Sequence, residues 1–569
     1  MNSLFSYWTS VLRKNSLLLV LSMLLPTFGV GKSAIAAERI YASYLPFERS
    51  VSVTALEKYA RKGVIDDDLI VYTQYLKKEQ LQQLRRALLN PIKVDPVAVS
   101  QFLYTPQGEF LLRRLTEVIK TESRQSKVGF HALRSALILA SAEPGGLTLL
   151  NLLRQYPSSG IYIDLSRTLR IAAELEKLVN ETNKAITAVS QKSHVEAAAI
   201  KLPLDFSQLP DLQRKGRFTP QKQTLKFFDS VRRRFLLTDV YLPKVQSRVP
   251  VIVISHGLGS DSSNFEYLAI HLASHGFAVV VPNHPGSDTK QLRSLLNGST
   301  SEVAQADEFK NRPLDVEYIL NQLEQRSRTD ARFKGRLNLQ KVGVFGQSFG
   351  GYTALALAGA KINFDQLQKD CHPKALRDTW NLSLLLQCQA LKSHGNDSKE
   401  YNFRDERVKA VIAVNPMTSS IFGEAGLSQI QTPVMIVAGS DDTIAPALYE
   451  QLVPFSWIKN SQKYLAVVSG ATHFSMIGNG TGSRQQIALP SELVGNHPSL
   501  ARRYMSVLSV PFFETYVTET PGYTTYLNAA YARVISSRSG DLSLIRFLTR
   551  TELAQAKKST TTSEILTEK

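Results

Sequence analysis

Residues 341–358 read KVGVFGQSFGGYTALALA, and this stretch decides the fold. Its first five residues form a short apolar run typical of a buried strand, and the residues after Gly350 have the composition of a helix start. Between them lies a G-x-S-x-G turn, residues 346–350. Small glycines let such a turn bend sharply enough to push a serine hydroxyl outward. We therefore predict that Ser348 is a nucleophile.

Apolar runs alternate with helical stretches on both sides of this turn, from about residue 225 to 550. The strand-like runs are 251–255, 278–281, 342–345, 408–414, 434–438 and 464–468. Continuous apolar strands separated by helices are typical of a mostly parallel sheet, because helices cover both of its faces. The sequence therefore predicts an α/β domain over 225–550.

A serine hydroxyl needs a base to take its proton and an acid to orient that base. In strand–turn–helix serine enzymes the acid follows the serine along the chain, and the histidine comes last. Asp442 follows the run 434–438, and it is preferred to Asp441 because it lies further into the loop. His473 follows the next run, whereas His497 lies too far beyond a strand. We predict a triad of serine, Asp442 and His473.

The oxyanion of an acyl-transfer intermediate needs hydrogen-bond donors. We predict the backbone N–H groups of Phe349, which follows the nucleophile, and of Leu258, in the loop HGLG at 256–259. His256 is expected to hydrogen-bond within this loop, and His284 to lie in a rigid loop. No spaced cluster of ligands indicates a metal, and no glycine-rich loop indicates a phosphate or another cofactor.

Several of these motifs resemble the α/β-hydrolase superfamily. They are HGLG, the run ASHGFAVVVPNHPG at 273–286, GQSFGG at 346–351 and the late GATH. More narrowly, they look like the platelet-activating-factor acetylhydrolase and dienelactone-hydrolase branch. Acetylhydrolases often carry His before the nucleophile, and this chain has Gln347 there, a departure that leaves the triad intact but concerns substrate choice. The resemblance implies an α/β-hydrolase fold.

The N-terminal part of the chain has a different character. Residues 1–37 have a basic start, an apolar stretch and an A-x-A site, which predicts a cleaved signal peptide; a retained anchor is the alternative. Residues 38–200 read as an all-helical domain, with a long helix from Asp164 to about 190. Joined to such an α/β domain, they are similar to a cyanobacterial-type family of predicted hydrolases of unassigned function. Residues 201–224 read as a linker, and 551–569 as a polar tail.

An insertion at about 361–405 contains Cys371 and Cys388, the two cysteines of the chain. In an oxidising compartment two nearby cysteines are expected to pair, although two buried free thiols are the alternative. The apolar stripe around 382–386 fits a lid over an acyl pocket as well as it fits a helix packed on the sheet. We hypothesise that a disulfide clamps this segment as a lid.

The formal net charge is +18, and loss of Arg13, Lys14 and Lys32 with the signal peptide lowers it to +15. This charge suits an anionic membrane surface or acidic partners. Nucleic-acid binding is not expected, because the basic residues are scattered. The tightest basic cluster, 232–234, is more typical of a solvated strand entry than of a binding patch.

The sequence therefore predicts an exported serine hydrolase, with the periplasm favoured over a lumen or full secretion. Its expected substrates are carboxylic esters, either lipid or small acyl esters, cleaved through an acyl-enzyme. A serine peptidase of the prolyl-oligopeptidase type shares the triad order, but its propeller would need many short strands. A silent binding or scaffold protein is the third hypothesis.

Overall fold

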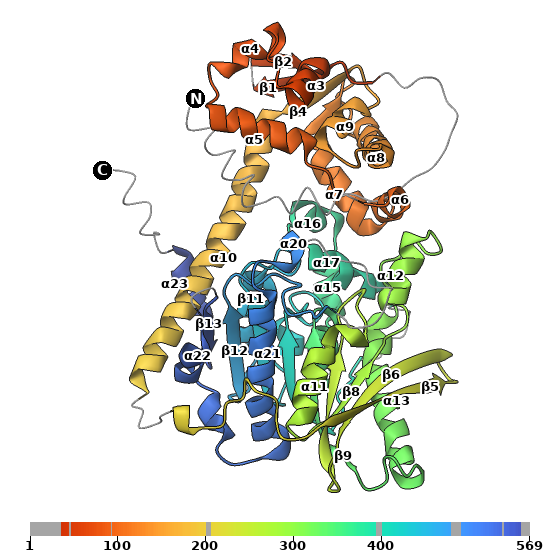
Figure 1. Cartoon of the computed structure of the whole chain (residues 1–569), viewed down its shortest axis with the longest axis vertical. Coiled ribbons are helices and arrows are strands. Elements are labelled where there is room, and N and C mark those ends of the chain that lie inside the picture. The colour runs from red at the N-terminus through yellow and green to blue at the C-terminus, as the bar shows by residue number, and fades with distance from the viewer. Residues whose placement is uncertain are drawn as a thin grey trace. The chain divides into compact units, whose positions relative to one another are not determined.

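The computed structural model describes residues 36–44, 47–92, 94–200, 206–393, 401–479, 491–537 and 540–558 (Figure 1). The predicted signal peptide therefore lies almost wholly outside the described residues. The chain divides into two compact units, one up to Leu178 together with Arg293–Val303, and the other with Val179–Leu292 and all residues from Ala304 onward. None of the described helices is both long and apolar enough to cross a bilayer.

The first unit is rich in helices, as predicted. They are α3 (Val53–Lys62), α4 (Asp67–Thr73), α5 (Lys78–Leu89), α6 (Pro96–Leu103), α7 (Pro106–Thr116), α8 (Ser126–Ala142) and α9 (Leu149–Arg154). Polar caps fix several starts: the Ser52 side chain accepts from the Ala55 N–H, and the Asp95 side chain accepts from two N–H groups in the first turn of α6. Gly63, with φ 73°, ends α3 in the left-handed conformation.

The expectation that this region is entirely helical is wrong in one respect, because it also contains a four-stranded sheet. Its strands are β1 (Arg39–Tyr44), β2 (Phe47–Ser52), β3 (Ile119–Thr121) and β4 (Gly160–Asp164), in the order β2-β1-β4-β3. β1 pairs in parallel with β4, more than 100 residues later in the chain. Two strands so far apart in the sequence produce no repeating pattern within a short window, so the helical spacing of the residues between them did not indicate a sheet.

Helix α10 (Leu165–Ala199) follows β4 and extends further than the predicted end near residue 190. Within the second unit, its Ser193 lies against strand β13 (Leu542–Ile545). The Ser193 Oγ accepts from the Leu544 N–H at 3.1 Å and lies 3.3 Å from the Leu544 carbonyl oxygen. This part of α10 therefore covers an edge strand.

The second unit contains a nine-stranded sheet, which confirms the α/β prediction. Its order is β13-β12-β11-β10-β9-β7-β8-β6-β5. The remaining strands are β5 (Pro220–Asp229), β6 (Arg234–Pro243), β7 (Val249–Ser255), β8 (Ala278–Pro282), β9 (Leu337–Gln347), β10 (Val408–Val414), β11 (Val434–Gly439) and β12 (Lys463–Val468). The run from β8 to β12 is parallel, whereas β13, β6 and β5 are antiparallel additions.

Helices cover both faces of this sheet, which explains why its central strands are apolar throughout. α11 (Glu266–Ser274) and α21 (Pro498–Phe513) pack together on one face, while α13 (Glu308–Thr329) and α14 (Phe349–Leu357) pack together as well and contact the sheet (Figure 1). The remaining helices are α12 (Thr289–Leu296), α15 (Phe364–Asp370), α16 (Pro373–Asp378), α17 (Leu382–Gln387), α18 (Gly423–Leu427), α19 (Val453–Trp457), α20 (Ser491–Val494), α22 (Ala529–Ile535) and α23 (Arg550–Lys558).

Two boundaries differ from the expected ones. β5 begins at Pro220, inside the expected linker 201–224, because its register with β6 extends to Pro243. α23 occupies the first part of the expected polar tail. It forms because Glu552 and Thr549 cap its start reciprocally, and because Leu553 is buried.

Candidate active site

Ser348 lies at the junction between β9 and α14, in a backbone conformation that side-chain-bearing residues seldom adopt. Its φ is 55° and its ψ is −115°, so the turn is strained. The flanking glycines are needed because the backbone passes very close to them. A Cβ on Gly346 would lie 1.9 Å from the Gly350 carbonyl oxygen, and one on Gly350 would lie 1.9 Å from that of Ser255. The geometry is that of a nucleophile elbow.

The structure brings Ser348, His473 and Asp442 into one hydrogen-bonded chain. The Ser348 hydroxyl lies 2.9 Å from His473 Nε2, and His473 Nδ1 lies 2.7 Å from Asp442 Oδ2. All three residues are buried. A carboxylate only accepts, so Nδ1 carries the proton and Nε2 is left to accept from the serine. This tautomer is the one that a base acting on Ser348 requires.

Each partner comes from a loop at the carboxyl end of another parallel strand, β11 for Asp442 and β12 for His473. Asp442 follows β11, and its Oδ1 also accepts the N–H groups of Ile444 and Ala445 at 2.9 and 2.8 Å. These bonds fix the carboxylate, so that Oδ2 is aimed at the imidazole. Asp441 is exposed and hydrogen-bonds with Ser440, and His497 is exposed at the start of α21. The structure thus brings together the preferred acid and base and not their competitors.

Two residues outside the predicted triad and oxyanion pair hold the backbone of His473. The Gln347 side chain donates to the His473 carbonyl at 3.0 Å, and Asn415 donates to it at 3.4 Å. Asn415 also accepts the Gly439 N–H at 2.8 Å and therefore joins the loops after three strands. A polar residue directly after the apolar run 408–414 was the available signal.

The HGLG loop lies against the elbow. A Cβ on Gly257 would lie 2.3 Å from Gln347 Oε1, so a larger residue there would displace the Gln347 side chain. The Gly257 carbonyl, in the same peptide unit as the Leu258 N–H, accepts from His256 Nδ1 at 2.7 Å. Phe349 is the first residue of α14, where a backbone N–H has no acceptor within the helix. Both predicted oxyanion donors therefore sit on segments next to Ser348.

His256 and His284 are structural residues of this region, as expected. His256 Nε2 accepts the His284 N–H at 3.0 Å, while His284 contacts Ser255 and Asp315 through its two ring nitrogens. Burial lowers the pKa of both imidazoles well below the usual value, so both are neutral. The hydrogen bonds of these two neutral imidazoles hold the HGLG loop in place and do not transfer protons.

A buried network of charges lies beneath the HGLG loop. The fully buried Arg312 donates to the His256 carbonyl at 2.6 Å and to the Ser287 hydroxyl at 2.9 Å, with a longer contact of 3.5 Å to the Gly257 carbonyl. Its guanidinium also lies 4.3 Å from the centroid of the Phe349 ring. Burial lowers the pKa of Arg312 to about 10, which leaves it charged at neutral pH. One cation therefore contacts both segments that carry the predicted oxyanion donors.

The network continues into the basic cluster at 232–234. Arg234 pairs with Glu308 at 2.7 Å and Asp315 at 2.8 Å, and Arg232 reaches Asp315 at 2.8 Å. The interpretation of this cluster as a solvated strand entry is therefore wrong for two of its three members. Three consecutive arginines look alike in the sequence, so the sequence alone does not show which of them point toward the carboxylates of α13.

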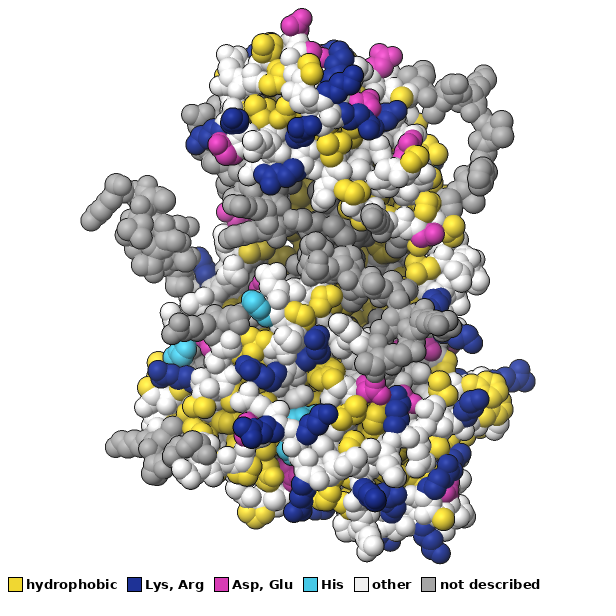
Figure 2. Space-filling model, viewed as in Figure 1, with side chains coloured by type: hydrophobic (Ala, Val, Ile, Leu, Met, Phe, Trp, Pro, Cys, Tyr) yellow, Lys and Arg dark blue, Asp and Glu magenta, His cyan; other side chains and the backbone are white. Residues whose placement is uncertain are grey.

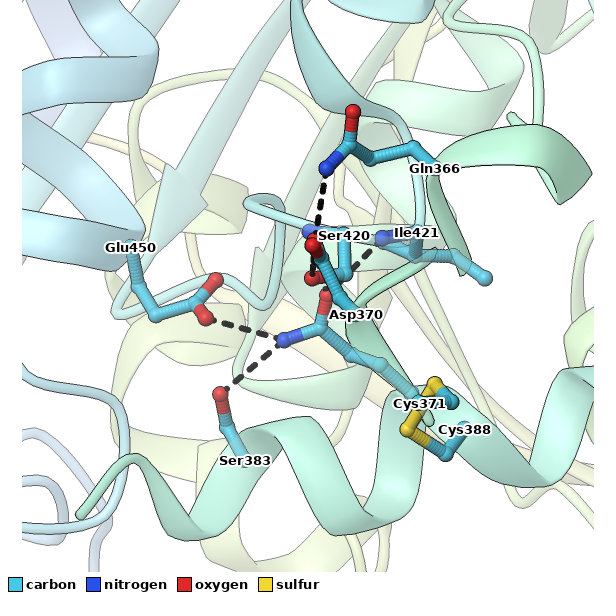
Figure 3. The surroundings of a disulfide bond; sticks show 9 residues. Gln366, Asp370, Cys371, Ser383, Cys388, Ser420, Ile421 and Glu450 are labelled. Atoms are coloured by element: carbon cyan, nitrogen blue, oxygen red, sulfur yellow. Dashed lines mark hydrogen bonds between the residues drawn. A yellow bond between two sulfur atoms is a disulfide. The ribbon is translucent and has the colours of Figure 1, made fainter. Parts of the chain in front are cut away.

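The insertion carries the predicted disulfide between Cys371 and Cys388. The bridge joins the end of α15 to the end of α17 (Figure 3), and Gln387 directly precedes Cys388 in the chain. The Gln387 side chain donates to Glu450 at 2.9 Å and accepts the N–H groups of Ser420 and Ile421 at 3.0 and 2.9 Å. The bridge therefore borders a polar network that ties the insertion to the loop after β10.

Helix α17 is also tied to the loop that carries Asp442. The Ser383 N–H donates to the Ile444 carbonyl at 2.9 Å. Leu384, Leu385 and Leu386 are buried in this helix. Residues 394–400 of the insertion lie outside the described residues. Among the described residues, no group of three His, Cys, Asp or Glu side chains is arranged to hold a metal ion.

Comparison with known proteins shows which families two parts of the chain resemble. Residues 36–164 match a family described as "alpha/beta hydrolase of unknown function", and residues 250–365 match one described as "alpha/beta hydrolase fold". The platelet-activating factor acetylhydrolase of Cavia porcellus is 28% identical over 140 residues, which cover 20% of this chain. The chain spans about a third of that relative, 32% of its length. With the strand order, these matches show that the chain has an α/β-hydrolase fold.

Proposed function

We propose that this protein is a serine hydrolase that cleaves carboxylic esters through an acyl-enzyme. The observation that carries the proposal is the hydrogen-bonded chain from Ser348 to His473 to Asp442, with distances of 2.9 and 2.7 Å, on a strained elbow. A serine without a neighbouring base is a poor nucleophile, and this arrangement supplies the base in the correct tautomer.

In this mechanism Ser348 Oγ attacks the ester carbonyl while His473 Nε2 takes the hydroxyl proton. Asp442 stabilises the imidazolium that forms, and the N–H groups of Leu258 and Phe349 bind the oxyanion. The imidazolium then gives its proton to the leaving alcohol, which leaves an acyl group on the serine. A water molecule, deprotonated by the same imidazole, releases the acid and restores the serine hydroxyl.

The proposed substrates are lipid or small acyl esters. The name of the Cavia porcellus relative refers to acetyl hydrolysis, and this supports an ester rather than a peptide. The buried leucines of α17 make this segment apolar, and the Ser383 N–H in its first turn donates to the loop that carries Asp442. Gln347 occupies the place before the nucleophile, where it orients the backbone of His473.

We also propose that the protein is exported, with the periplasm as its compartment. A disulfide between Cys371 and Cys388 supports this, because such bridges persist in oxidising compartments. N-terminal sequencing of the mature protein from fractionated cells tests the proposal. A periplasmic form that begins at Ala37 is expected, and a cytoplasmic form that keeps its first 36 residues would contradict it.

Labelling with a fluorophosphonate probe tests the activity. The wild type should be labelled and Ser348→Ala should not, although both should show the same thermal melt. A panel of p-nitrophenyl esters of rising chain length, run beside peptide substrates, then identifies the reaction. Turnover of peptides in preference to esters would assign a peptidase instead, and an unlabelled wild type would indicate a silent scaffold.

A further inference from the structure

The hairpin of β5 and β6 presents one face that nothing in the described chain covers. Along both strands alternate residues point away from the sheet, and the register places Phe228 opposite Phe235 and Lys226 opposite Leu237. The two phenylalanine rings contact each other, with their centroids 4.4 Å apart. The outward residues therefore form one continuous surface, which we call the hairpin face.

The hairpin face exposes large apolar side chains that a folded protein ordinarily buries. Val231 at the turn is 91% exposed and Phe235 is 72% exposed, while Phe228 and Leu237 are 47% and 42% exposed. Scattered single apolar residues on a surface need no explanation, but a cluster of four in which two aromatic rings touch indicates a contact surface.

The charge of this face is positive only. Lys226 and Arg233 are exposed, and neither takes part in an ion pair with any residue that the structure describes. The hairpin's two acids, Asp229 and Asp239, are buried. In Figure 2, hydrophobic and basic side chains lie side by side at the tip of this hairpin, on the right of the view.

We propose that the hairpin face binds the surface of an anionic lipid bilayer. Aromatic and aliphatic side chains can enter the region between headgroups and acyl chains, while Lys226 and Arg233 meet lipid phosphates. A second copy of this chain would bring the same positive charges together. An acidic polypeptide would neutralise the positive charges, but it would offer the two phenylalanine rings less apolar surface than a bilayer does.

The position of the hairpin fits such a role. β6 runs antiparallel to β8 with Thr238 opposite Pro282, so the hairpin turn lies at the carboxyl edge of the parallel strands. Ser348 lies at the same edge. A bilayer that binds the hairpin would therefore meet the side of the sheet that carries the elbow. The proposal does not rest on ester hydrolysis, and its test measures binding alone.

Flotation with vesicles tests the proposal with the full chain. The wild type should float with vesicles of phosphatidylglycerol and phosphatidylcholine, and not with phosphatidylcholine alone. Phe235→Ser should lower the partition coefficient about tenfold, since one ring no longer leaves water. Phe547→Ser is the matched control, because Phe547 is 52% exposed outside the hairpin and should have no effect.

The charges are tested separately. Lys226→Glu combined with Arg233→Glu should lower binding at least about tenfold, and added salt should weaken wild-type binding. Lys334→Glu with Lys409→Glu changes the net charge equally at exposed positions elsewhere and should have a much smaller effect. Equal losses from both pairs would overturn the proposal, because general charge would then explain the binding.

Two other outcomes would also overturn it. Dimers in sedimentation experiments that disappear in Phe235→Ser would assign the hairpin face to a second copy of the chain. Retention on polyglutamate together with no binding to vesicles would assign it to an acidic polypeptide. All variants change exposed side chains, and a thermal melt like that of the wild type shows that they fold.

Discussion

Replacing Arg312 with methionine should reduce both stability and turnover. The side chain is fully buried and donates to the His256 carbonyl at 2.6 Å and the Ser287 hydroxyl at 2.9 Å. Methionine has similar length but no donor and no charge, so these acceptors and the nearby Glu308 carboxylate lose a partner. Breaking a buried ion pair on one side costs about 3 to 5 kcal/mol, which is the expected fall in the free energy of unfolding.

The effect on turnover follows from the peptide unit between Gly257 and Leu258. Loss of an oxyanion donor lowers kcat about 10²- to 10³-fold. His256 still holds the Gly257 carbonyl at 2.7 Å in the variant, so the Leu258 N–H is only loosened. We therefore expect kcat to fall about tenfold, with KM little changed.

The assay combines urea unfolding with kcat and KM on a soluble p-nitrophenyl ester. Arg312→Lys keeps the charge and should recover part of the loss. Arg407→Met is the matched control, because Arg407 pairs with Asp405 at 2.6 Å away from the elbow and should lose stability without losing kcat. If Arg312→Met folds and keeps kcat within about twofold of the wild type, the positioning argument is refuted.

Asp442→Asn should lower kcat about 10⁴-fold because the imidazole loses its orienting carboxylate, whereas the exposed Asp441→Asn should leave kcat unchanged in the same assay. Burial lowers the pKa of His271 to about 4, whereas a histidine in the unfolded chain titrates near 6.5. Between about pH 4 and 6.5 the unfolded chain binds more protons than the folded protein. The free energy of unfolding should therefore fall by up to about 1.4 kcal/mol per pH unit as the pH falls. Urea titrations at several pH values should show a smaller slope for His271→Gln. Replacing Cys371 and Cys388 with serine opens a loop of sequence separation 17 and should cost about 3 kcal/mol in the same titrations. If long-chain ester turnover survives this change and reduction of the wild type, the disulfide does not clamp a lid.

The central sheet and the hydrogen-bonded chain of three residues could be predicted because their signals are local. Each parallel strand is an unbroken apolar run, and each predicted residue of the triad follows such a run directly. Strand order also places Ser348, Asp442 and His473 at one edge, since neighbouring parallel strands end together. The preference for Asp442 over Asp441 rested on its depth in the loop, and the structure places Asp442 beside the imidazole.

The rest depends on contacts between distant parts of the chain. Asn415 and Gln347 meet the His473 carbonyl only after three strands have paired. The first unit's sheet joins β1 to β4 across the helices between them. Which arginine of the cluster at 232–234 faces inward depends on α13, a separate segment. None of these contacts leaves a pattern within a short window of sequence.

The contact between the Ser193 hydroxyl of α10 and strand β13 has a consequence for how the chain can be divided. An edge strand with bare N–H and C=O groups is a template for pairing with other molecules, and a helix laid along it removes that hazard. The helix is made early in synthesis, whereas Leu542–Ile545 is made almost last. When β13 is synthesised, the helix that covers it is therefore already present. A fragment that starts at β5 would lack that cover and should aggregate through β13, so an α/β domain intended to stand alone has to include the part of α10 that carries Ser193, as the second unit from Val179 onward does.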